Sequence, residues 1–188
     1  GEMAQLTGIN LGTGRTAISI AARSYHTCAL LDDGSVKCWG RNNYGELGID
    51  NTTDMGDGPG EMAQLTGINL GTGRTATSIS AKSYNTCAVL DDGSVKCWGR
   101  NNYGELGIDN TTDMGDNPGE MAQLTGINLG TGRTATAIAT GQTHSCAKLD
   151  NGAVKCWGRN NMGQLGIDNT TDMGDDPGEM ASLPSVNL

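Results

Sequence analysis

The sequence predicts an all-β protein made of three tandem blades of the β-propeller type, each with four short strands. Two observations support this fold class. The chain repeats itself every 59 residues, and each repeat alternates strand-forming segments with Gly-rich turns. In addition, no stretch shows the 3.6-residue period of an amphipathic helix, so we expect no helix.

The repeat divides the chain into units of equal length. The motif GEMAQLTGINL begins at Gly1, Gly60 and Gly119, and it returns as GEMASLPSVNL at Gly178. We therefore expect blades over residues 1–59, 60–118 and 119–177, followed by a partial fourth repeat, 178–188, whose strand completes a blade. Closed propellers have about four to eight blades. Three blades do not close a ring, which leaves an open array, a ring of several chains or a spiral.

Four segments of each repeat are expected to form strands. In the first repeat they are residues 3–11, residues 17–22 and the two arms of a hairpin over 25–40. Small and β-branched side chains fill 17–22, which suits the crowded axis of a radial assembly, so we place this strand innermost. The side chains expected inside the blade are Leu6, Ile9, Trp39 and Leu47, with Tyr44 at a corner.

Two cysteines face each other in each predicted hairpin. The turn DDG sets a register in which Cys28 lies opposite Cys38, near the separation that a disulfide needs. The pairs are Cys28/Cys38, Cys87/Cys97 and Cys146/Cys156. Zinc is disfavoured because no second ligand pair lies nearby and His26 is replaced by Asn85 in the second repeat. We expect three disulfides, as in small-core proteins of oxidising compartments, with buried thiols as the alternative.

The hairpin and its Gly-rich corner have a recognisable pattern. HTCALLDDGSVKCWGRNNYGELG and its two copies resemble the repeat of the regulator of chromosome condensation family, closest to the cysteine-bearing version found in secreted bacterial and algal proteins. The resemblance implies a propeller, usually closed by about seven blades. Members of that family include a nucleotide-exchange factor for a small GTPase and a β-lactamase inhibitor, and both hold a partner on a propeller face.

Charge and composition restrict the partners. The net charge of −9 and the pI of about 4.5 argue against nucleic acid or an anionic membrane surface as partner. No apolar run approaches the roughly 20 residues of a membrane helix, so no membrane insertion is expected. The sequence lacks a signal-peptide pattern and begins at Gly1, from which we expect a processed or excised chain. With its paired cysteines, the protein is expected outside the cell or at the cell surface.

An acidic loop follows each hairpin, at residues 49–61 in the first repeat. Its recurring aspartates are Asp50, Asp54, Asp57, Asp109, Asp113, Asp116, Asp168, Asp172 and Asp175. Such oxygen ligands suit Ca²⁺, while local turn hydrogen bonds are the other interpretation. The loops also carry the glycosylation sequons of Asn51, Asn110 and Asn169, which would be used in a secreted eukaryotic protein.

Basic side chains recur beside these loops. They are Lys37, Lys96 and Lys155 on the hairpins, and Arg41, Arg100 and Arg159 after each Trp-Gly. Two arrangements are open: ion pairs between blades, or a solvated face.

No catalytic set recurs in the sequence. It contains no repeated Ser-His-Asp or Cys-His combination, no P-loop and no dinucleotide fingerprint, so we do not expect an enzyme. The leading hypothesis is an extracellular structural protein whose blades self-associate, with identical chains or neighbouring repeats, into a filament, sheath or surface layer. The alternative is a propeller-type binding module, adhesin or inhibitor-like, from a longer array and with a protein or glycan partner. A calcium-dependent adhesin is a third hypothesis.

Overall fold

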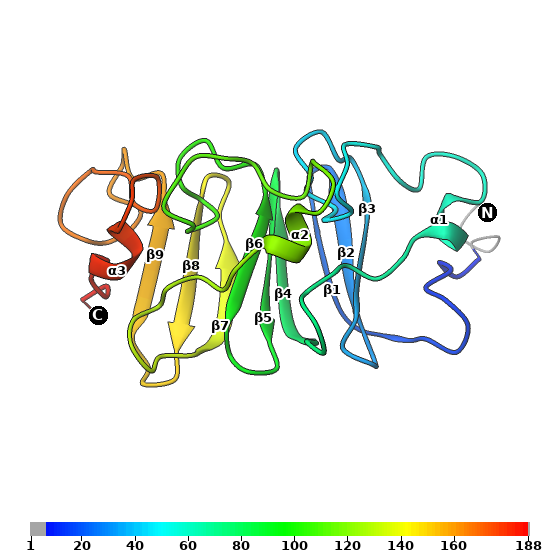
Figure 1. The fold of residues 1–188 in the computed structure, drawn as a ribbon, viewed down its shortest axis with the longest axis horizontal. Coiled ribbons are helices and arrows are strands. Elements are labelled where there is room, and N and C mark those ends of the chain that lie inside the picture. The colour runs from blue at the N-terminus through cyan, green and yellow to red at the C-terminus, as the bar shows by residue number, and fades with distance from the viewer. Residues whose placement is uncertain (1–6, 188) are drawn as a thin grey trace, which may run out of the picture.

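The structure is a computed structural model that describes residues 7–187. It contains three antiparallel sheets of three strands, arranged side by side in chain order (Figure 1). The strands are β1 (Ala17–Arg23), β2 (His26–Leu31), β3 (Val36–Gly40), β4 (Ala76–Lys82), β5 (Asn85–Leu90), β6 (Val95–Gly99), β7 (Ala135–Thr140), β8 (His144–Leu149) and β9 (Val154–Gly158). We call these sheets, with their loops, blades 1, 2 and 3. The predicted all-β fold of repeated blades that do not close a ring is confirmed.

The hairpin register is the one that the sequence predicts. Cys28 lies opposite Cys38, and Leu30 lies opposite Val36. Gly34 has a φ of 77°, which a glycine adopts without strain, and its N–H donates to the carbonyl of Leu31. Disulfides join Cys28 to Cys38, Cys87 to Cys97 and Cys146 to Cys156, with Cα atoms 4.0 to 4.1 Å apart.

Two predictions are wrong: within residues 7–187 each blade lacks the expected fourth strand, and short helices do form. The first copy of that strand begins in residues 3–6, including Leu6, which lie outside the described residues, and residues 7–11 are not in a strand. Its later copies begin with the single helical turns α1 (Glu61–Gln64), α2 (Glu120–Gln123) and α3 (Glu179–Ser182). A four-residue helix is too short to show a period, and Glu61 stabilises the turn before it by accepting the N–H groups of Gly56 and Gly58.

After each helical turn the chain runs along the outer edge of a blade with little pairing. One backbone hydrogen bond holds it there, from Ile68 N to Val36 O (2.9 Å) in blade 1. The partial fourth repeat does the same in blade 3, where Val186 N donates to Val154 O (2.8 Å). This segment lies along the edge of blade 3 as an irregular stretch, not as the strand that the sequence predicted. An isolated bridge between Gly40 and Met55 covers the other part of the edge.

The hydrophobic core lies between the blades. One cluster packs Leu30 and Val36 of blade 1 against Ile79, Leu90 and Trp98 of blade 2. A second cluster repeats this arrangement between blades 2 and 3. Strand β4 contacts both β1 and β7, in agreement with the innermost position predicted for this strand.

The predicted core residues of blade 1 differ in burial. Leu47 is fully buried, whereas Trp39 and Tyr44 are half-buried and Ile9 is exposed. Trp39 differs from its counterparts Trp98 and Trp157, which are fully buried, because no earlier blade among residues 7–187 covers it. Within the described part of the chain, no helix is long and apolar enough to cross a bilayer.

Candidate functional site

Arginine and tyrosine side chains from all three blades meet in one strip. We call it the arginine–tyrosine ladder; its members are Tyr25, Arg41, Tyr44, Tyr84, Arg100, Tyr103 and Arg159. The first rung is Arg41, whose Cζ lies 5.1 Å from the ring centroid of Tyr25 and 5.3 Å from that of Tyr84. Since Tyr84 belongs to the next blade, Arg41 makes cation–π contacts across a blade junction.

The pattern continues along the chain. Arg100 lies 5.2 Å from Tyr84, 5.7 Å from Tyr44 and 5.9 Å from Tyr103. Arg159 lies 4.7 Å from Tyr103. Edge-to-face packing of Tyr44 on Tyr84, with centroids 5.7 Å apart, fills the strip between the arginines.

Local backbone geometry brings each arginine to its tyrosine. Gly40 has a φ of 109°, and a Cβ there would lie 2.5 Å from the carbonyl oxygen of Tyr25. This tight approach lets Arg41 N donate to Tyr25 O (3.0 Å). The same backbone bond joins Arg100 to Tyr84 (2.9 Å). The Trp-Gly-Arg sequence thus builds the ladder directly.

Buried carboxylates accept hydrogen bonds from the backbone of two ladder tyrosines. Glu46 Oε2 accepts the N–H of Tyr44 (2.7 Å), and its Oε1 lies 4.0 Å from Arg41 Nε. Glu105 accepts the N–H of Tyr103 in the same way (2.6 Å), and burial raises the pKa of Glu105 to about 7. Because these carboxyls sit inside the blade, they fix the corner that carries each tyrosine.

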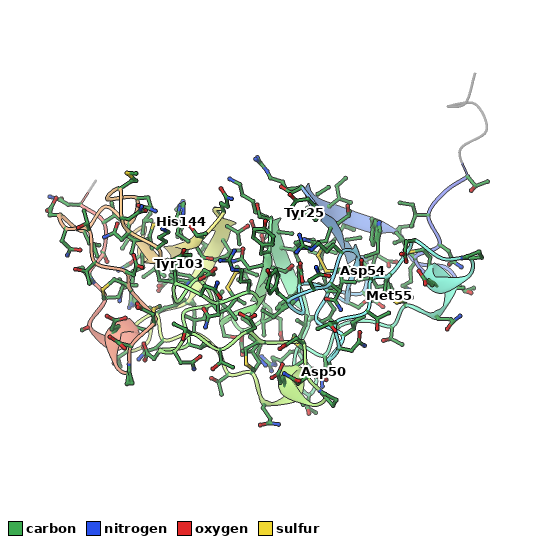
Figure 2. All side chains as sticks on the ribbon, turned by 90° about the horizontal axis from the view of Figure 1, so that it is seen from above. Tyr25, Asp50, Asp54, Met55, Tyr103 and His144 are labelled. Atoms are coloured by element: carbon green, nitrogen blue, oxygen red, sulfur yellow. A yellow bond between two sulfur atoms is a disulfide. The ribbon has the colours of Figure 1, made fainter. Side chains whose placement is uncertain are left out.

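The ladder stops in blade 3. Thr143 and Met162 occupy the positions of the two tyrosines in the other blades, and Met162 is 84% exposed. Tyr25, at the other end, is 51% exposed. Figure 2 shows Asp50 near the lower edge of the view, apart from Tyr25 near the upper edge and from Tyr103.

Within residues 7–187 the recurring basic residues do not form the ion pairs with the acidic loops that were one of the two predicted arrangements. In residues 7–187 no aspartate of the acidic loops forms an ion pair with Arg41, Arg100 or Arg159, which stack on tyrosines instead. Lys96 is only 9% exposed and its Nζ lies beside Gly71, so a solvated face does not describe it. Lys37 and Lys155 lie in the same way beside Gly12 and Gly130.

The aspartates of each acidic loop have separate partners. Asp54 Oδ1 accepts the N–H of Asn42 (2.7 Å) within its own blade, as Asp113 and Asp172 do for Asn101 and Asn160. Asp50 Oδ1 instead accepts the N–H of Met121 (2.9 Å), across the junction with blade 2, and Asp109 accepts that of Met180. The bonds of Asp54, Asp113 and Asp172 stay within one blade, whereas those of Asp50 and Asp109 join two blades and are not the local turn bonds of the second interpretation.

The third aspartates lie near a glutamate of the following helical turn. Burial raises the pKa of Asp116 and of Asp175, and a neighbouring carboxyl, Glu120 or Glu179, raises it further. Asp57, the third aspartate of the first loop, is exposed. Asp168, which is aligned with Asp50 and Asp109, is exposed as well. In the described part of the chain no three acidic, histidine or cysteine side chains come close enough together to hold a metal ion. The fold of these residues therefore provides no set of ligands for the predicted calcium ion.

The sequon asparagines are exposed on the acidic loops. Asn51 Oδ1 accepts the N–H of Thr53 (2.8 Å), and Asn110 and Asn169 make the same turn. Their glycosylation stays a prediction.

Models of one protein family match this chain. Models described as the regulator of chromosome condensation (RCC1) repeat match residues 17–46, 76–105 and 135–164, and also 92–147. Among similar proteins, the probable E3 ubiquitin-protein ligase HERC3 of Homo sapiens is 32% identical over 84% of this chain. The ultraviolet-B receptor UVR8 of Arabidopsis thaliana is 31% identical over 78% of it. The chain spans 14% of HERC3 and 30% of UVR8.

Solved structures share the fold. Human WBSCR16 superposes with a TM-score of 0.69 at 18% identity, over 94% of this chain and 41% of its own. Prp20p of Saccharomyces cerevisiae gives a TM-score of 0.67 at 20% identity, over 92% of this chain and 38% of its own. The matched repeats, the sequence relatives and the shared fold agree: this chain belongs to the regulator of chromosome condensation (RCC1) repeat family.

Proposed function

We propose that this chain is a non-enzymatic, extracellular module that binds a protein partner through the arginine–tyrosine ladder. The observation that carries the proposal is the convergence of three arginines and four tyrosines from three blades on one strip. Arginine and tyrosine dominate the residues that contribute most to protein–protein affinity.

Two further observations support this role. Prp20p, which has the same fold, was described together with its binding to Gsp1p and histones, so a propeller of this type holds protein partners. The three disulfides fit an oxidising compartment, which supports a partner outside the cell.

The test compares aligned positions inside and outside the ladder. Immobilised wild-type protein is exposed to secreted and cell-surface proteins, and the affinity of each retained protein is then measured. Tyr103→Ala, combined with Arg100→Ala, is expected to weaken binding at least about tenfold, as loss of a central contact does. Met162→Ala, at the position aligned with Tyr103, is the matched control and leaves binding unchanged. Equal binding by the ladder variant and the control contradicts the proposal.

Self-association into a filament, sheath or surface layer stays a second prediction. It requires the two end faces of the row of blades, which no residue from 7 to 187 covers (Figure 1), to pack on each other, and the exposed Lys148 at the blade 3 end opposes that contact. Electron microscopy of the non-reduced protein tests it: long fibres with a regular repeat support it, and single short particles contradict it.

A further inference from the structure

The outer face of blade 1 is built like a blade junction, but no blade within residues 7–187 lies against it. Ile20 on this face is 69% exposed, whereas the aligned Ile79 and Ile138 are each 9% exposed. Trp39 is half-buried, whereas the aligned Trp98 and Trp157 are completely buried. Blade 1 thus presents to solvent an apolar surface that blades 2 and 3 bury.

The two junctions inside the chain show what covers such a face. The backbone carbonyl of Glu46 accepts hydrogen bonds from Trp98 Nε1 (3.1 Å) and Thr86 Oγ1 (2.9 Å) of the next blade. At the second junction Glu105 does the same for Trp157 (3.1 Å) and Ser145 (2.9 Å). The corner of one blade therefore inserts its carbonyl between two donors of the following blade.

Blade 1 carries the same donors without an acceptor. Trp39 and Thr27 are aligned with Trp98 and Thr86, and neither side chain forms a hydrogen bond with any residue from 7 to 187. Beside Thr27 lies an open pocket of about 360 Å³, lined by residues 22–27. Met62 is aligned with Met121, whose N–H is held by Asp50 of the preceding blade.

Blade 3, at the other end of the row, carries residues aligned with the hydrogen-bond acceptors of the junctions, but at one position it has a charged side chain in place of an aliphatic one. Gln164 and Asp168 in blade 3 are aligned with Glu46 and Asp50, and His144 is aligned with His26, which contacts Thr86 (2.8 Å) at the first junction. However, Lys148 occupies the position of Leu30 and Val89, which are 1% and 2% exposed inside the junctions. An unpaired ammonium buried at that position is strongly unfavourable.

We propose that the outer face of blade 1 is a docking socket for another RCC1-type blade, and that Lys148 prevents blade 3 of a second copy from filling it. The occupant presents a corner carbonyl to Trp39 and Thr27, an aspartate to Met62, and an aliphatic side chain where Lys148 stands. This surface adjoins the arginine–tyrosine ladder at Tyr25, which lines the pocket, but the proposal does not rest on the ladder's function.

A single substitution in the full chain tests both parts. Lys148→Val gives blade 3 the residue of blade 2, at a position that is exposed in the free chain. Self-association, measured by light scattering after size exclusion and by sedimentation, is expected to become about a hundredfold tighter, the scale of removing an unpaired buried charge. The wild-type mass stays at 19.4 kDa at concentrations where the variant forms higher multiples.

Two further variants of the Lys148→Val protein identify the face. Adding Ile20→Asp, a change at an exposed side chain, is expected to restore the monomer, because it places a charge on the socket. Adding Thr52→Asp, on an exposed loop, is the control and leaves the oligomer intact. The proposal is overturned if Lys148→Val remains monomeric, if Ile20→Asp leaves the oligomer intact, or if the wild type associates as tightly as the variant.

Discussion

The indole Nε1 of Trp98 donates a hydrogen bond of 3.1 Å to the backbone carbonyl of Glu46, in the preceding blade. The hydroxyl of Thr86 donates to the same oxygen (2.9 Å), so both lone pairs of one carbonyl are used. Blade junctions in this chain are therefore held by directional bonds within an apolar contact, and these bonds position the corner that carries the ladder.

Loss of the tryptophan indole N–H should destabilise the protein at Trp98, which lies in a blade junction, more than at Trp39, which lies in no junction formed by residues 7–187. We expect Trp98→Phe to lower the free energy of unfolding by about 1–3 kcal/mol, because it leaves a buried acceptor short of a donor and a small cavity. Trp39→Phe, at the aligned half-buried position, should lower it by less than about 1 kcal/mol. Urea unfolding of both variants measures the difference; equal losses would show that the bond to Glu46 contributes little.

Glu105→Gln should change stability in a pH-dependent manner. Burial raises the pKa of Glu105 from 4.5 to about 7, so the folded state holds a proton that the unfolded state releases between those values. The stability that Glu105 contributes is complete below pH 4.5 and is lost as the pH rises through 7. We expect Glu105→Gln to raise the free energy of unfolding by about 3 kcal/mol at pH 8, and little at pH 4.5.

Blade 3 provides the precedent for this substitution. Gln164 is aligned with Glu105, and its Oε1 accepts the N–H of Met162 (2.8 Å) as the carboxylate does for Tyr103. Thermal unfolding at several pH values gives the measurement. A difference between variant and wild type that stays constant from pH 4.5 to pH 8 would contradict the assigned pKa.

His26→Asn should show the opposite pH dependence. Burial lowers the pKa of His26 from 6.5 to about 4, so the unfolded state binds the proton first as the pH falls. The stability gained by burying the neutral ring is present above pH 6.5 and is lost toward pH 4. Asparagine, which stands at the aligned position 85, does not titrate. As the pH falls from 7 to 4.5, the free energy of unfolding of the variant should therefore rise relative to that of the wild type by about 2–3 kcal/mol. Parallel stability curves for the two proteins would exclude this.

Each disulfide should stabilise its blade modestly. The cysteines of a pair are 10 residues apart, so the chain-entropy model gives about 2–3 kcal/mol per bridge. Cys87→Ser with Cys97→Ser should lower the free energy of unfolding by this amount under oxidising conditions. Titration of free thiols in the unfolded wild type is the control, since six reactive thiols before reduction would contradict the pairing.

The hairpins were predictable because their determinants are local. The DDG turn and the alternation of strand residues define the pairing of Cys28 with Cys38 without reference to the rest of the chain. The helical turns were not predictable, since four residues beginning at Glu61 carry no period. The blade edge that these segments cover needs only one hydrogen bond, and no strand pattern is required for that.

The ladder depends on contacts between blades, which periodicity does not reveal. Tyr44 was expected at a corner, but its meeting with Arg100 of the next blade requires the twist between blades. Both tyrosine positions change in the third repeat, to Thr143 and Met162. Many other positions of that repeat change as well, such as Lys148 and Asn151, so the sequence alone does not single out the ladder.

The middle blade has a neighbour on both faces, while blades 1 and 3 have one each among the described residues. In a linear array with nearest-neighbour coupling, such an arrangement frays from its ends inward. Backbone amides of β5 should therefore exchange with deuterium most slowly, and those of β1 and β7–β9 should exchange through partial opening before the whole chain unfolds. The order of exchange would then follow position in the row, although the three repeats are nearly alike in sequence.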